Sequence, residues 1–103
     1  METANELAMR GELGKIERVL GNICLAQGAL ADAESHLTEG LALLEEAGDE
    51  YEVACCQLDF AALYSREGKT ADCEAMLASC LPTLERLEAK LELAQVESLR
   101  AVA

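Results

Sequence analysis

An internal repeat is the feature that most constrains how this chain can fold. Residues 28–45 and 68–85 share, without a gap, the pattern G-x-x-A-D-x-E-x-x-L-x-x-x-L-x-x-L-E. The two copies lie 40 positions apart, and a fixed period of about 20 to 50 residues is typical of solenoids. In a solenoid each unit buries its apolar face against its neighbours. The repeat therefore predicts a binding surface rather than an enclosed catalytic pocket.

Apolar residues around this motif follow the three- and four-residue spacing of a helical face. They predict a helix over about 12–27 that ends at Gly28, with an apolar stripe of Leu13, Ile16, Leu20, Ile23 and Cys24. A second helix follows and breaks at Gly48. The cycle restarts at residue 52, breaks at Gly68 and begins its next helix at Thr70, the expected N-cap. A third pass opens at residue 92.

We therefore expect an all-α fold, an α-solenoid of two antiparallel helical hairpins plus one additional helix. It forms a single domain over 1–103, with repeat 1 at about 12–51, repeat 2 at about 52–91 and a terminal helix at 92–103. Solenoids usually need about three units and a polar cap to be stable. The pattern thus predicts a fragment of a longer protein, or a chain that recovers a neighbour by self-association.

Two features leave the second hairpin open to alternatives. Pro82 falls inside its second helix, where a missing backbone donor kinks or splits the helix. The turn that follows has lost its glycine, because residues 87–90 (LEAK) replace residues 47–50 (AGDE). A nearly continuous helix from about residue 83 to the C-terminus is therefore an alternative to a turn.

Composition restricts the partners and the compartment. Twenty acidic residues against eight basic ones give a formal charge of −12, which repels nucleic-acid phosphates and anionic membranes. No apolar run reaches the length of about 20 residues that a membrane span needs. The N-terminus does not resemble a signal peptide, and five cysteines are an odd number without a disulfide framework. We expect a reduced, cytoplasmic protein that binds neither nucleic acid nor membranes.

The helix pairs resemble the tetratricopeptide repeat, whose pattern is W-x2-L-G-x2-Y, then A-x3-F, then P. The matching segments are Glu17-x2-Leu20-Gly21-x2-Cys24 with Ala33-x3-Leu37, and Gln57-x2-Phe60-Ala61-x2-Tyr64 with Cys73-x3-Leu77. Neither unit has the aromatic anchor, and the period is longer than the usual 34. Longer periods are similar to those of large bacterial signalling proteins and transcriptional regulators. Small residues such as Gly21 are expected to let neighbouring helices approach closely.

Catalytic chemistry has little support in the sequence. On the repeat, Cys24, Cys56, Cys73 and Cys80 occupy apolar or small packing positions, whereas Cys55 faces the groove and is expected to be the most exposed thiol. There is no C-x-x-C pair, and the single histidine, His36, has no partner at ligand spacing. We find no nucleophile or phosphate-binding motif. We therefore expect neither an enzyme nor a bound metal or cofactor.

In the family that the chain resembles, peptides lie in a concave groove lined by the first helix of each hairpin. The resemblance assigns partner contact in this groove to Lys15, Arg18, Asn22, Leu25, Leu58 and Arg66, with Ala26, Cys55, Asp59, Ala62, Ser65, Gln95 and Ser98 beside them. Lys15 and Arg18 can equally be ordinary solvated charges. Asp59 would repel a ligand carboxylate, which disfavours binding of a chaperone C-terminal tail.

These observations predict a protein-interaction module that binds a peptide or helix of a protein partner, within a bacterial signalling or transcription-regulatory protein. The alternative is structural self-assembly, as a homodimer or larger homo-oligomer, in which residues 92–103 pack onto another copy through Val96 and Leu99. A metal-dependent or thiol enzyme is the third hypothesis, and it predicts bound metal or a thiol of low pKa.

Overall fold

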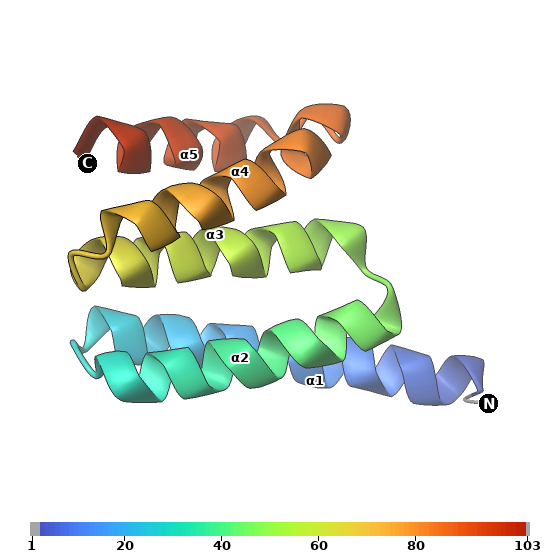
Figure 1. Ribbon diagram of the computed structural model, residues 1–103. Coiled ribbons are helices and arrows are strands. Elements are labelled where there is room, and N and C mark those ends of the chain that lie inside the picture. Colours follow the sequence, from blue (N-terminus) through green and yellow to red (C-terminus); the bar gives the residue numbers. More distant parts are fainter. Residues whose placement is uncertain (1–2, 103) are drawn as a thin grey trace.

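All elements of the structure, a computed structural model that describes residues 3–102, are helices. They are α1 (Ala4–Ala26), α2 (Leu30–Ala47), α3 (Glu50–Arg66), α4 (Thr70–Arg86) and α5 (Lys90–Val102). Consecutive helices run antiparallel and stack in chain order, from the α1–α2 pair to α5 at the opposite end (Figure 1). The prediction of an all-α fold made of two helical hairpins and one further helix is confirmed.

The helix boundaries confirm some of the predicted signals and correct others. Gly28, Gly48 and Gly68 follow helix ends with φ of 78°, 74° and 75°, a left-handed conformation that glycine adopts without a Cβ penalty. α1 begins well before residue 12, because Thr3 accepts a hydrogen bond from the Glu6 backbone N–H at 3.2 Å and caps the helix. Thr70 is not an N-cap. Lys69 holds that position without a side-chain cap, and Thr70 is the first residue of α4.

The alternatives for the second hairpin are resolved in favour of a turn. α4 continues through Pro82 to Arg86, so the proline does not split it. The chain then turns, with the Ala89 backbone N–H donating to the Leu84 carbonyl at 3.0 Å. Glu88 has φ of 54° in the place that Gly48 occupies in the first unit. The continuous helix from residue 83 is therefore wrong, and α4 and α5 are separate elements.

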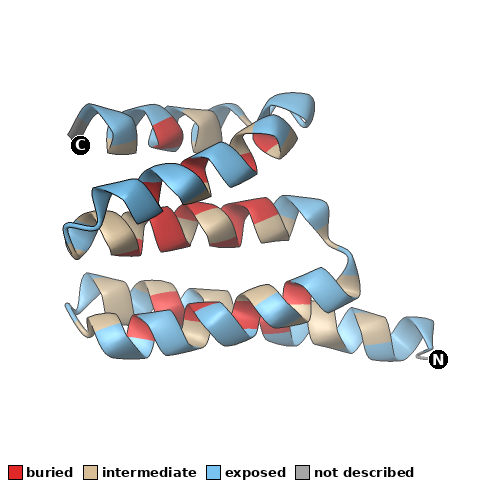
Figure 2. Cartoon of the chain, viewed as in Figure 1, coloured by how far each residue is buried: buried red, intermediate tan, exposed pale blue. Residues whose placement is uncertain are grey.

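The core is organised around α3, which carries buried residues on two faces (Figure 2). One face packs against α4 and α5 in the α3–α4 cluster, which consists of Ala54, Leu58, Ala61, Cys73, Leu77, Cys80, Leu84 and Val96. The other packs against α2 in the α2–α3 cluster, which consists of Ala33, Leu37, Leu44, Cys56, Phe60 and Leu63. α3 thus joins the two hairpins by taking part in both clusters.

α1 and α2 approach each other closely because glycines lie between them. A Cβ at Gly14 would lie 2.7 Å from Leu44 Cγ, and one at Gly21 would lie 2.8 Å from Leu37 Cγ and 3.3 Å from the Ala33 carbonyl oxygen. Both glycines are buried. The expectation that small residues permit close packing is confirmed at Gly21.

The predicted apolar stripe of α1 lies on the other side of that helix and is not buried. Leu13, Ile16, Leu20 and Ile23 are 37–54% exposed, and only Cys24 of the stripe is partly covered. The periodicity therefore identified a helical face correctly, although no other part of residues 3–102 covers it.

Two glycine substitutions on α1 separate close packing from helix propensity. Gly21→Ala should lower the free energy of unfolding by about 1–3 kcal/mol, because the new methyl group must displace buried Leu37. Gly11→Ala is the matched control. Its Cβ would lie 3.5 Å from Ala47 Cβ, an ordinary contact, so it should raise the free energy of unfolding by about 0.5–1 kcal/mol. Urea denaturation measures both; equal stabilisation by the two substitutions would refute the close-packing account.

Candidate functional site

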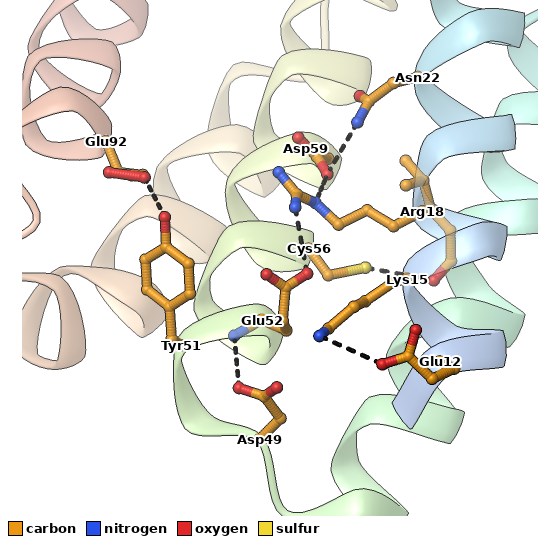
Figure 3. A network of polar contacts seen from close by, with 11 residues as sticks. Glu12, Lys15, Arg18, Asn22, Asp49, Tyr51, Glu52, Cys56, Asp59 and Glu92 are labelled. Atoms are coloured by element: carbon orange, nitrogen blue, oxygen red, sulfur yellow. Dashed lines mark hydrogen bonds and ion pairs between the residues drawn. The ribbon is translucent and has the colours of Figure 1, made fainter. Parts of the chain in front are cut away.

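Two of the predicted groove residues, Arg18 and Asn22, point from α1 toward α3 and bind acidic side chains there (Figure 3). Arg18 Nε donates to Asp59 Oδ2 at 2.5 Å, and Arg18 Nη1 donates to Glu52 Oε1 at 3.3 Å. Asn22 Nδ2 donates to the same Asp59 oxygen at 3.2 Å. We call these four residues the α1–α3 polar network. The network connects α1 of the first hairpin to α3 of the second hairpin.

Partial burial shapes the electrostatics of this network. Burial by itself would lower the pKa of Arg18, but the Asp59 carboxylate raises it above its usual value, so the guanidinium stays charged. Burial raises the pKa of the Asp59 carboxyl above its usual range, although Arg18 and Asn22 act in the opposite direction. The network is therefore a partly desolvated pairing rather than a set of free recognition groups.

The other predicted contact residues lie outside the α1–α3 polar network. Arg66 Nη1 donates to the Leu25 backbone carbonyl at 2.9 Å, so it satisfies an end carbonyl of α1. Leu25 is partly buried beside the α2–α3 cluster. Leu58 is 4% exposed and belongs to the α3–α4 cluster. Lys15 forms an exposed pair with Glu12 at 3.6 Å. The structure thus brings Arg18 and Asn22 together on Asp59 and brings Arg66 to Leu25. It places Leu58 in the core and Lys15 apart from both groups.

A hollow of about 260 Å³ opens between α3 and α5 on this inner face. Its lining consists of Leu58, Asp59, Ala62, Gln95, Ser98 and Leu99. All but Leu99 were predicted to border the groove, whereas Leu99 was assigned to self-assembly. The repeat contains the missing signal, because residue 99 lies 40 positions after Asp59 and so occupies the equivalent inner position. Nearby, the Tyr51 hydroxyl donates to Glu92 and bridges α3 to α5.

Cys55 is not the most exposed thiol. It is 2% exposed, because Tyr51 and Arg18 lie beside it. Burial raises the pKa of Cys55 to about 11 and the pKa of Cys56 to about 12, so both thiols stay protonated at neutral pH. Cys24 is the partly exposed cysteine, and the other four are buried.

His36 contacts an acidic side chain of the neighbouring helix. Its Nδ1 lies 2.7 Å from Glu17 Oε2, across the α1–α2 pair. Within residues 3–102, no three His, Cys, Asp or Glu side chains are grouped so that they could hold a metal ion. The same residues contain no helix with the length and hydropathy that a membrane crossing requires.

Comparisons with protein-family models, with curated proteins and with solved structures gave no match to this chain. Its resemblance to the tetratricopeptide repeat therefore stays a prediction, based on the 40-residue period and the small-residue positions. The all-helical hairpin arrangement stands independently of that assignment.

Thiol reactivity should follow the burial of the cysteines. At about pH 7.5 an aromatic disulfide reagent should modify Cys24 rapidly and the four buried thiols only as the protein unfolds, because thiolate is the reactive form. A rapid phase that survives Cys24→Ser but disappears in Cys55→Ser would show that α3 does not bury Cys55.

The raised pKa of Asp59 predicts how stability depends on pH. The folded state holds this proton more tightly than the unfolded state, so the contribution of Asp59 to stability is fully present below about pH 4 and is lost as pH rises through the folded pKa. Asn at this position can still accept a hydrogen bond from Arg18 and does not titrate.

We therefore expect the free energy of unfolding of Asp59→Asn to increase relative to that of the native chain between about pH 4 and about pH 7. Urea denaturation of both chains at each pH gives this difference. A difference that is constant, or that changes in the opposite direction, would mean that Arg18 outweighs burial and holds the pKa of Asp59 down.

Proposed function

We propose that this chain is a protein-interaction module that holds a segment of a protein partner on its inner face, at the hollow between α3 and α5. The hollow itself is the observation that carries the proposal. It combines an apolar floor from Leu58, Ala62 and Leu99 with a polar rim from Asp59, Gln95 and Ser98. Apolar lining with a few polar groups that fix orientation is the usual composition of a binding site.

The chemistry of the rim indicates the kind of segment that fits. An apolar side chain of the partner would occupy the floor, while its backbone would meet the amide of Gln95 and the hydroxyl of Ser98. The chain has a formal charge of −12, although Asp59 at the edge of the hollow is already paired with Arg18. A segment with basic residues beside its apolar anchor is therefore favoured over an acidic one.

In this proposal the contact residues differ in part from those expected from the resemblance. Leu58 keeps its role at the floor. Arg18 and Asn22 act indirectly, because they hold Asp59 in place from α1. Arg66 supports the end of α1 through the Leu25 carbonyl. The proposal extends to a scaffold role in bacterial signalling or transcriptional regulation, which rests on the family resemblance alone.

Self-assembly through the terminal helix is less well supported. That hypothesis needs Val96 at an interface between copies, but Val96 is 2% exposed and lies in the α3–α4 cluster. Presenting it to another copy would require α5 to detach from α4. Leu99 is also partly buried against that cluster and lines the hollow.

Peptides selected from a random library on the native chain test the proposed function. They should carry an apolar anchor flanked by basic residues, and Ser98→Arg should weaken their binding at least tenfold because the longer side chain and its charge enter the hollow. Ser35→Arg, an equivalent change on the exposed part of α2, should leave binding unchanged. Equal binding to Ser98→Arg and the native chain, measured by fluorescence anisotropy, would contradict the proposal.

A further inference from the structure

The outer face of α1 carries most of the exposed apolar side chains. Within the described part of the chain, six of the nine large apolar side chains that are exposed lie on this helix. They are Met9, Leu13, Ile16, Val19, Leu20 and Ile23. Four of them belong to the apolar stripe of α1, and Val19 lies beside it with 57% exposure. Contiguous exposed apolar residues of this kind mark interaction surfaces.

The repeat shows what kind of surface fits this stripe. Forty positions later, the same places on α3 hold apolar residues that are at most 4% exposed and pack with α2 in the α2–α3 cluster. The matching pairs are Ile16 and Cys56, Leu20 and Phe60, and Ile23 and Leu63. α2 runs antiparallel to α3 (Figure 1). The stripe therefore has the positions that pack against an antiparallel helix of the α2 kind.

A second copy of the chain has no such helix to offer, because α2 and α4 each pack between two neighbours. Leu37 of α2 lies over Gly21 of α1 and belongs to the α2–α3 cluster. Leu77 of α4 shares the α3–α4 cluster with Val96 of α5. Every large apolar side chain of α2 and α4 is buried or half-buried. Two copies with a charge of −12 also repel each other.

A hollow at the edge of the stripe indicates which side chain the occupant inserts. It has a volume of about 230 Å³, and its lining is Glu12, Lys15, Ile16, Val19 and Leu20. On α3 the places of Lys15 and Val19 hold Cys55 and Asp59, where Arg18 of α1 lies. An arginine reaching the hollow on α1 would meet the charge of Lys15 and find no Asp59. The hollow therefore suits an apolar side chain rather than a basic one.

The start of α1 favours a helix from another protein over one joined to α1 by the turn of the repeat. Gly48 and Asp49 form the turn that joins α2 to α3. Forty positions earlier, Ala8 and Met9 lie inside α1, which already begins at Ala4. A helix joined to α1 as α2 is joined to α3 would need α1 to break there. A helix of a separate protein meets no such constraint.

We propose that the apolar stripe of α1 docks an amphipathic helix of a protein partner, which lies antiparallel to α1 as α2 lies antiparallel to α3. This helix has a polar outer face and the apolar spacing of α2. In α2 the spacing is that of Leu30, Ala33, Leu37, Leu41 and Leu44, all of which belong to the α2–α3 cluster or pack against it. The stripe shares no residue with the hollow between α3 and α5, so it is a second and separate partner site.

A labelled peptide of residues 28–49, which contains α2, is the probe for such a helix. Fluorescence anisotropy should give a dissociation constant in the micromolar range, because about three turns of helix bury less than the roughly 1,600 Å² of a standard interface. Methyl NMR signals of Leu13 and Ile23 should shift on binding. The double variant Ile16→Glu, Leu20→Glu should weaken binding at least tenfold, because it places two charges under the bound helix.

Leu91→Glu is the matched control, because Leu91 is 73% exposed on α5, away from the stripe. It should leave binding unchanged, and so should Ser98→Arg, which separates this site from the hollow between α3 and α5. The peptide that carries Leu37→Glu should bind at least tenfold more weakly than the native peptide. Ile16 and Leu20 are exposed in the chain, so helicity and melting of the double variant should match those of the native chain.

Three results would overturn the proposal. The first is no binding at about 200 µM peptide. The second is binding that the double variant leaves unchanged, which would mean that the peptide replaces α2 within the fold. The third concerns a second copy as the occupant: sedimentation equilibrium of the chain alone would show a dimer that Ile16→Glu, Leu20→Glu dissociates.

Discussion

The packing of α3 on both of its sides is the interaction on which the rest of the structure depends. Ala54, Leu58 and Ala61 face α4 and α5, while Cys56, Phe60 and Leu63 face α2. Burial of apolar surface is the main favourable term in folding, and seven of the 17 residues of α3 are buried. Without α3 neither core cluster would form, and α1 would lose its polar contacts with Asp59 and Glu52.

The repeat also explains why the two end helices differ from α3. At the positions of Ala54 and Ala61, α1 has Gly14 and Gly21, which bring it against α2, while its apolar stripe stays exposed. α5 buries Val96, but Arg100 stands where α3 has Phe60 and pairs instead with Glu74, its Nη2 lying 2.7 Å from Glu74 Oε1. One residue pattern thus yields a central helix and two partly covered ones. The proposed peptide hollow lies beside α5, and the exposed apolar stripe lies on α1.

Much of the fold could be predicted from the sequence, because helical spacing and the 40-residue period depend on local pattern. The pattern placed Cys56, Cys73 and Cys80 in the core. It could not show that Arg18 reaches Asp59, since that contact depends on how two helices a full repeat apart face each other. The same limit led to the wrong prediction for Cys55, which is buried beside Tyr51 and Arg18. The prediction that Thr70 caps α4 was wrong, because the helix already begins at Thr70 and Lys69 holds the N-cap position.

Native-state hydrogen exchange tests the central role of α3 most directly. Amides of α3 should exchange only through global unfolding, so their free energy of exchange should equal the free energy of unfolding from urea denaturation. Amides of α5, which buries Val96 alone among its described residues, should exchange with a free energy lower by about 1 kcal/mol or more. Exchange of α3 through partial openings, at or below the free energy found for α5, would contradict this account.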